Sequence, residues 1–112
     1  MPVKTEDHNQ VCVLAVTGDF AGEDVKATRK LFEDAIDRRH LADVVVDLEK
    51  AGFVDSEALE LLLWMKQRCE DLFGRIKLVG LDENVRKILE LTRLEARFET
   101  HADLASALKT MK

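Results

Sequence analysis

Apolar residues follow two different spacings along this chain, and the two spacings alternate. A continuous apolar run occupies residues 11–16 (VCVLAV), and two further strands are predicted at residues 42–48 (ADVVVDL) and 75–79 (RIKLV). Runs of this kind are typical of strands that are covered on both faces of a sheet. Gly18 is expected to end the first strand, and the weakly alternating residues 3–7 to form an edge strand paired with it.

Other segments show the helical spacing of apolar residues. The first begins at Gly22 and places on one face Val25, Thr28, Phe32, Ala35, Ile36 and Arg39. The second follows a loop with Gly52, begins near Asp55, runs to about Phe73 and stops at Gly74. The apolar face that we expect for this second helix consists of Ala58, Leu62, Met65, Cys69, Leu72 and Phe73.

Two shorter helices are predicted in the last third of the chain. Asp82 is a suitable N-cap for a helix that buries Val85, Ile88 and Leu89. Thr100, with Asp103 three residues later, resembles a capping box and predicts a terminal helix. The inward residues of that terminal helix are expected to be Leu104, Leu108 and Met111.

With Phe98-Glu99 as a last short strand, the predicted order of elements is β-β-α-β-α-β-α-β-α. Strands that alternate with helices form a mainly parallel sheet covered by helices, so the fold class is α/β. At 112 residues the chain has the size of one domain, expected over residues 1–112 with a core at about 10–110. We expect a mixed, mostly parallel sheet of four to five strands and about four helices.

The net charge argues against nucleic acid as a direct partner. Seventeen basic and 22 acidic residues give −5, whereas proteins that neutralise phosphates are usually basic. The excess of acid lies in residues 1–56, which indicates where a charge-driven partner contact would form. No run approaches the ~20 apolar residues of a membrane helix, and the first ten residues do not resemble a signal peptide. We therefore expect a cytoplasmic protein without membrane insertion.

Few residues carry recognisable catalytic or metal-binding chemistry. Cys12 and Cys69 lie in apolar settings and are expected to be buried, reduced thiols, and we predict no metal, no cofactor and no catalytic residue. The motifs GxxxxGK[ST], GxGxxG and GxSxG are absent from the sequence. One enzyme-class alternative is a small phosphotransfer domain in which Asp47, at the end of VVVDL, accepts the phosphoryl group.

The residues most open to a functional interpretation follow the strand at 42–48, because ligands gather at the carboxyl ends of parallel strands. Asp55 is expected to cap the second helix, and Ser56 to lie in its first turn, where unpaired amides and the helix dipole favour a phosphate. Alternatively, Asp55 and Ser56 form an ordinary helix start that has no function in binding. Both interpretations stay open at this point.

Trp64 is predicted to lie away from the apolar face of the second helix, among Glu57, Glu60, Arg68 and Asp71. Tryptophan is enriched in binding hot spots, so Trp64 is a candidate contact residue. The alternative is that its side chain packs on a neighbouring loop.

Residues 44–63 (VVVDLEKAGFVDSEALELLL) resemble the signature of the STAS domain of anti-sigma factor antagonists. Residues 75–100 (RIKLVGLDENVRKILELTRLEARFET) are similar to the second half of that family. The resemblance implies a STAS-like fold and a partner-switching function. Ser56 would be phosphorylated by an anti-sigma factor that is also a serine kinase, the unphosphorylated form would bind that kinase, and a phosphatase would reset the switch.

The shared location of these residues and the off-face Trp64 predict a partner-binding surface at Asp55, Ser56, Glu57, Glu60 and Trp64; the oligomeric state stays open. The family usually has Ser or Thr and then Gly after the phosphorylated serine, whereas this chain has Glu57 and Ala58. A carboxylate beside Ser56 opens the alternative of a constitutive binding module. Arg93 stands where many relatives have Gly. A second class of function is a cytoplasmic STAS accessory subunit of a lipid or anion transport system.

Overall fold

Strands and helices alternate through residues 3–111, the part of the chain that the computed structural model describes. The elements are β1 (Val3–His8), β2 (Val11–Phe20), α1 (Glu23–Asp37), β3 (Asp43–Val54), α2 (Ser56–Asp71), β4 (Ile76–Val79), α3 (Glu83–Leu91), a 3₁₀ turn (Glu95–Arg97), β5 (Glu99–His101) and α4 (Leu104–Lys109). The predicted order, and an α/β domain with a mixed sheet, are confirmed. Within residues 3–111 no helix is long and apolar enough to cross a membrane.

The five strands lie in the sheet in the order β1-β2-β3-β4-β5. The edge strand β1 runs antiparallel to β2, and the other neighbours are parallel. A two-residue turn joins β1 to β2, and both of its residues, Asn9 and Gln10, have positive φ (47° and 71°). That backbone matches the turn type whose twist suits antiparallel strands, so the predicted edge strand forms despite its weak alternation.

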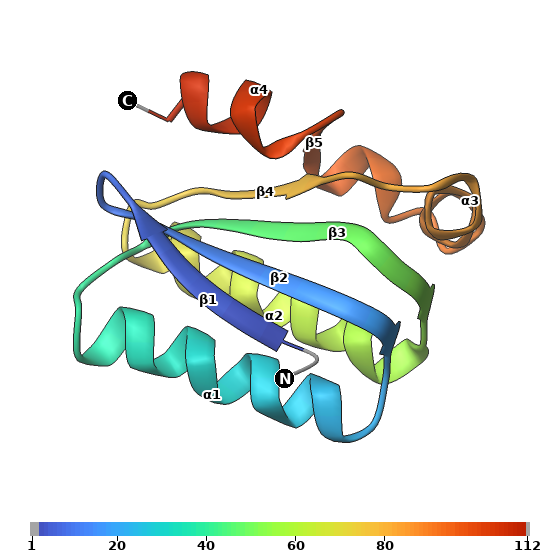
Figure 1. Ribbon diagram of the computed structural model, residues 1–112, viewed down its shortest axis with the longest axis horizontal. Coiled ribbons are helices and arrows are strands. Elements are labelled where there is room, and N and C mark those ends of the chain that lie inside the picture. Colours follow the sequence, from blue (N-terminus) through green and yellow to red (C-terminus); the bar gives the residue numbers. More distant parts are fainter. Residues whose placement is uncertain (1–2, 112) are drawn as a thin grey trace.

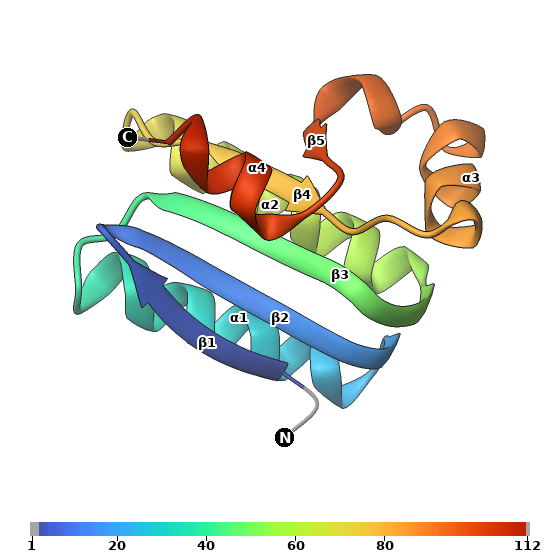
Figure 2. The same ribbon diagram turned by 45° about the horizontal axis from the view of Figure 1, so that its top comes forward.

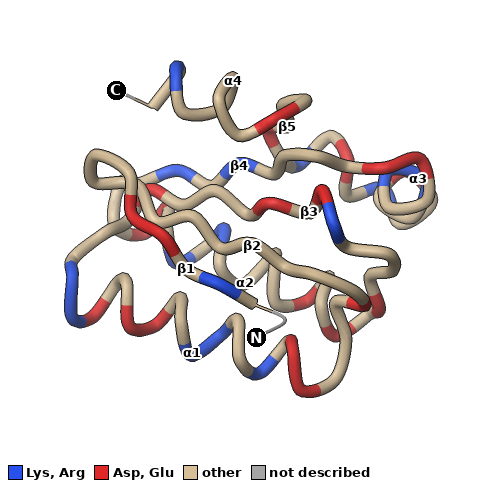
Figure 3. Tube along the Cα trace, in the orientation of Figure 1, with Lys and Arg blue, Asp and Glu red and all other residues tan. Residues whose placement is uncertain are grey.

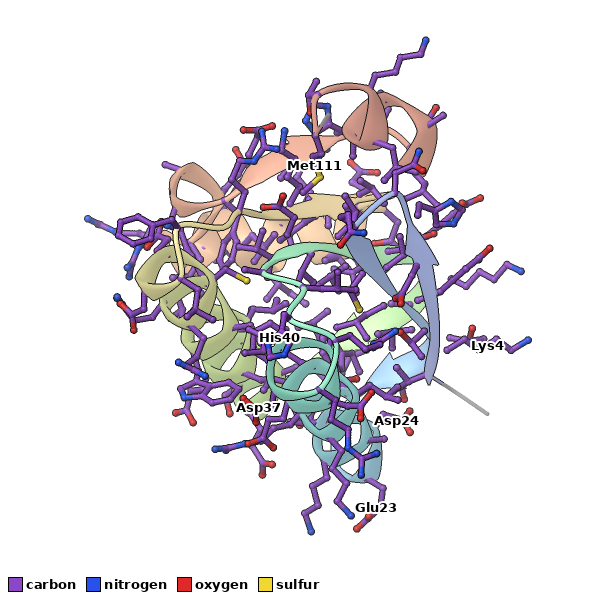
Figure 4. All side chains as sticks on the ribbon, turned by 90° about the vertical axis from the view of Figure 1, so that its left-hand side faces the viewer. Lys4, Glu23, Asp24, Asp37, His40 and Met111 are labelled. Atoms are coloured by element: carbon purple, nitrogen blue, oxygen red, sulfur yellow. The ribbon has the colours of Figure 1, made fainter. Side chains whose placement is uncertain are left out.

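Helices cover the two faces of the sheet unequally (Figures 1 and 2). We call the face covered by α1 and α2 the major face, and the face covered by α4 the minor face; α3 lies at the carboxyl end of β3 and β4. Met111, just after α4, lies on the opposite side of the sheet from Asp37 at the end of α1 (Figure 4). Alternate residues of β2 divide between the faces, because Cys12, Leu14 and Val16 belong to the core under α1 and α2 and Val11 and Val13 to the core under α4.

The minor face contains one buried cation. Lys77 of β4 is 2% exposed, forms an ion pair with Glu99 of β5 and donates a hydrogen bond to the Thr110 hydroxyl at the end of α4. Arg75 donates to the Thr110 carbonyl at 3.0 Å. These polar contacts act together with the small apolar core that includes Ala107 and Met111 in holding the short α4 on the sheet.

Two strands run further than predicted. β2 passes through Gly18, whose φ of 84° accompanies shifts in the β2–β3 pairing, and continues to Phe20. β3 continues through the predicted loop at Gly52 to Val54. Gly18 therefore allows an irregularity in the strand instead of ending it, as glycine commonly does inside a strand.

The predicted start of the terminal helix was wrong by three residues. Thr100 pairs with Leu78 in the sheet, and the N-cap of α4 is Asp103, whose carboxylate accepts from the Ser106 amide at 2.8 Å. Thr100 is occupied by the β4–β5 pairing, so Asp103, the next residue with a capping side chain and extended backbone, starts the helix.

The predicted apolar face of α2 was wrong at its end. The helix ends at Asp71, Leu72 is 44% exposed and Phe73 is 99% exposed. Phe73 has the left-handed φ of 61°, and the Gly74 amide donates to the Cys69 carbonyl at 2.7 Å. The left-handed turn residue is therefore Phe73 rather than the predicted Gly74, and Gly74 is needed because a Cβ there would lie 2.0 Å from the Ala42 carbonyl oxygen.

Candidate functional site

Asp55 fixes the start of α2, as the sequence predicts. Its backbone is extended (φ −91°, ψ 179°), and its Oδ1 accepts from the Ala58 amide at 2.8 Å. The Asp55 amide donates to the Phe20 carbonyl at 3.3 Å, which ties the start of α2 to the end of β2. The first turn of α2 is therefore held by both a cap and a contact with the sheet.

Ser56 is the first residue of α2, and its side chain is exposed. Among residues 3–111 the structure records no hydrogen bond made by its hydroxyl. The amides of Ser56 and Glu57 lie in the first turn, where the helix provides no acceptor. The hydroxyl is thus accessible, and amide groups and the positive end of the helix dipole lie beside it.

Three of the predicted site residues line one groove. Glu57, Glu60 and Trp64 follow each other at helical spacing along α2 and form one wall, and Lys26 and Arg29 of α1 form the other. The apolar residues between them are Val25 and Leu61. The groove has a volume of about 440 Å³, and we call it the α1–α2 groove. Asp55 and Ser56 directly precede Glu57 at the start of the α2 wall.

Trp64 is half-buried and packs on α1, not on a loop. Its ring lies edge-on to Phe32, with 5.5 Å between centroids and 68° between planes. The guanidinium of Arg29 lies over the Trp64 ring, 4.4 Å from its centroid. The surface that a partner would meet at this point is therefore shared between the indole and the stacked guanidinium.

The α1 side of the groove was not found from the sequence. Lys26 and Arg29 flank the apolar face of α1 that Val25 and Phe32 define, and charged residues in that position are usually solvated. Both signs of charge occur along α1 (Figure 3). The sequence shows only that a cation, Arg29, lies one helical turn after Val25. The packing of α1 against α2 is what places the Arg29 guanidinium over Trp64.

Neither thiol is available as a nucleophile. Cys12 and Cys69 are fully buried and free, as predicted. Burial raises the pKa of Cys69 to about 12, and burial also raises the pKa of Cys12. No group of three or more His, Cys, Asp or Glu side chains within residues 3–111 is arranged to hold a metal ion.

Asp47 does not fit the alternative of a phosphotransfer domain. Its Oδ1 accepts from the Glu49 amide at 3.0 Å, so the carboxylate stabilises the local backbone of β3. The sheet order is also different, because receiver domains have the parallel order 2-1-3-4-5, whereas here the first pair is antiparallel and the order is sequential.

Comparison with known proteins identifies the family. The model of the STAS domain matches residues 2–107. The chain belongs to the STAS domain family. An anti-sigma F factor antagonist of Paenibacillus polymyxa is 21% identical over 94 residues, which are 84% of this chain and 80% of that protein.

Solved structures share this STAS fold. A candidate anti-sigma factor antagonist of Thermotoga maritima superposes with a TM-score of 0.89 at 17% identity, over 97% of this chain and 93% of the other. The Bacillus cell fate determinant SpoIIAA in its phosphorylated form gives a TM-score of 0.79 at 20% identity, over 98% of this chain and 99% of the other. At these identities the likeness shows the fold.

Two departures from the usual STAS pattern now have a structural explanation. Ala58 is fully buried, so its methyl group packs in the core and cannot obstruct a partner at the surface. Arg93 has a φ of 62°, the left-handed conformation that favours glycine, and lies in the turn after α3. Glu57, by contrast, is exposed beside Ser56 and does change the charge of the site.

Proposed function

We propose that this STAS domain is a cytoplasmic anti-sigma factor antagonist. It binds an anti-sigma factor that is also a serine kinase, it has no catalytic activity of its own, and phosphorylation of Ser56 controls the complex until a phosphatase removes the phosphate. The observation that carries the proposal is the exposed Ser56 hydroxyl in the Asp55-capped first turn of α2. The similarity to anti-sigma factor antagonists supports the same function.

A phosphate on Ser56 would change binding without unfolding the domain. It adds about −1.5 to −2 charge at neutral pH, and the first turn of a helix stabilises such a charge. The fold therefore tolerates the modification. A partner that packs closely on Ser56 meets a new dianion next to Glu57, and a 100-fold loss of affinity requires only about 2.7 kcal/mol.

Affinity measurements on Ser56 variants test the proposal. With the purified anti-sigma factor of the source organism, Ser56→Ala should bind as tightly as the wild-type chain, and Ser56→Asp about 100-fold more weakly. Both variants should keep the wild-type circular dichroism spectrum and melting temperature, because the side chain is exposed.

Ser106 provides a matched control, since it is the other serine of the chain and also follows an aspartate cap. Ser106→Asp should leave the affinity unchanged. Wild-type affinity in Ser56→Asp would contradict the switch and leave a constitutive binding module whose charge Glu57 already sets. No binding by the wild-type chain would contradict the proposed function itself.

A further inference from the structure

The two walls of the α1–α2 groove carry opposite charges that are not paired across it. The Lys26 Nζ lies 3.5 Å from the Glu23 Oε1, and the Arg29 Nε lies 3.8 Å from the Glu33 Oε1, so both cations form their ion pairs within α1. Among residues 3–111 the structure records no ion pair for Glu57 or Glu60. Cations on one side and carboxylates on the other therefore remain available to an occupant of the groove.

Arg29 is held in position by the core beneath it. Its guanidinium stacks on Trp64, Trp64 packs edge-on against Phe32, and Phe32 is fully buried. A stacked guanidinium loses little further freedom when it binds a carboxylate, and it keeps its in-plane donors for a bidentate contact. Its ion pair with Glu33 is long and exposed, so a partner can replace it at small cost.

The chemistry of the groove selects a protein segment with both signs of charge. The apolar residues Val25 and Leu61 separate the walls, and Trp64 and Arg29 are residue types that dominate binding hot spots. The groove directly follows Ser56 along α2, so we assign it to the partner that contacts Ser56, and association with a second copy of the chain is an outcome of the test.

We propose that the α1–α2 groove receives a segment of the anti-sigma factor, with a carboxylate of that segment on Arg29 and a basic side chain at Glu60. This inference rests on the proposed function and extends the binding surface from α2 to α1. Glu60 lies one helical turn beyond Ser56, so the groove determines the affinity of the unphosphorylated form and the start of α2 controls release.

The test measures the affinity of the purified anti-sigma factor for groove variants by calorimetric titration. Arg29→Glu should weaken binding about 30-fold, as removal of a hot-spot residue does. Arg29→Lys keeps the charge but loses the planar stack, and should give a smaller loss of about threefold to tenfold. Glu60→Lys should weaken binding about tenfold, because it reverses the charge that faces the basic side chain.

Arg38→Glu is the matched control, since Arg38 is the C-cap of α1 and, like Arg29, pairs with an acid one helical turn away, here Asp34 at 3.6 Å. It should change the affinity less than threefold. Circular dichroism and thermal unfolding of every variant exclude loss of fold as the cause. Fluorescence of Trp64, the single tryptophan of the chain, should show in addition that Arg29→Lys keeps the indole packed.

Three results would overturn the inference. Wild-type affinity in Arg29→Glu and Glu60→Lys, together with weak binding by Ser56→Asp, would reject the groove and leave the proposed function standing. Equal losses in Arg29→Glu and Arg38→Glu would show a general effect of charge. A wild-type dimer in sedimentation that Arg29→Glu converts to monomer would assign the groove to a second copy of the chain.

Discussion

Helices α2 and α4 begin in the same way and cover opposite faces of the sheet, yet they offer different surfaces. Each starts after an aspartate whose carboxylate accepts from the amide three residues later, at 2.8 Å in both. Each carries one of the two serines of the chain. The Ser106 hydroxyl donates to its own cap, Asp103, at 2.5 Å, whereas Ser56 directly follows its cap and remains exposed.

The difference shows that an aspartate cap with a nearby serine is not in itself a site. Position relative to the cap decides whether the hydroxyl is satisfied, and the neighbouring helix decides whether a groove lies beside it. α2 has 16 residues and packs beside α1 on the larger core, whereas α4 has six residues, packs on the smaller core and receives a hydrogen bond from Lys77 at its end. We expect the major face to be the rigid support of the site and the minor face to be the weaker part.

Phe32→Ala and Met111→Ala give the largest expected contrast between the faces. Phe32 is fully buried beneath Trp64, and its truncation should lower the free energy of unfolding by about 3–5 kcal/mol. Met111 lies at the edge of the small core, and its truncation should cost about 2 kcal/mol. Urea denaturation measures both values. Equal losses of unfolding free energy in the two variants would contradict the expectation that the major face contributes more to stability than the minor face.

Lys77 variants examine the polar contacts of the minor face. Lys77→Ala removes the buried stem and leaves Thr110 without its donor, so we expect a loss of about 2 kcal/mol. Lys77→Met keeps the volume and removes the buried charge, and should stay within about 1 kcal/mol of the wild-type chain. Hydrogen exchange should locate the faster opening of Lys77→Ala in α4. Faster exchange in α2 instead would show that the two faces are not independent.

Arg93 lies in the turn after α3, outside both faces of the sheet, and the variant Arg93→Gly should be more stable than the wild-type chain. Arg93 has left-handed backbone, which costs a side chain roughly 1 kcal/mol relative to glycine. The free energy of unfolding of the variant should be about 0.5–1 kcal/mol higher than that of the wild-type chain. Its affinity for the anti-sigma factor should be unchanged. A lower melting temperature would indicate that the Arg93 side chain makes contacts that outweigh the strain.

The smallest expected effect is a pH dependence of the minor face. The hydrogen bond from Lys77, and then that from His101, hold the pKa of Glu99 below its ordinary value. Because the folded pKa is depressed, this contribution to stability is present above the pKa of the unfolded chain and is lost as pH falls through the folded pKa. Glu99 is half-exposed, so the effect should be below about 1 kcal/mol.

Glu99→Gln isolates this contribution. Between pH 6 and pH 3 the variant should lose less unfolding free energy than the wild-type chain. Equal losses in the two proteins would show that the Glu99 contacts do not stabilise the folded state in solution.

The features that depend on neighbouring residues in the chain were predicted from the sequence. The order of elements, the Asp55 cap, the exposed position of Ser56 in the first turn and the burial of both cysteines follow from local spacing and side-chain chemistry. Of the predicted apolar face of α2, the residues from Ala58 to Cys69 are buried, but the prediction omitted the buried Leu59 and Leu61 and failed where the helix ended.

The features that depend on packing between distant segments were missed. Nothing local to Trp64 indicates that Phe32 and Arg29 will cover it, since they come from α1, about 30 residues earlier. Nothing in the predicted strand at residues 75–79 indicates how the charge of Lys77 is satisfied until α4 packs over it and supplies Thr110. The extra length of β3 likewise follows from pairing with β2, which carries the strand past Gly52.

The most direct test of the central claim is the mass of the intact protein after incubation with its anti-sigma factor kinase and ATP. We predict that the wild-type chain and Ser106→Ala gain the mass of one phosphate and that Ser56→Ala gains none. A gain that persists in Ser56→Ala would place the modification on another residue. No gain in the wild-type chain, with the kinase active on itself or on another substrate, would contradict a switch at Ser56.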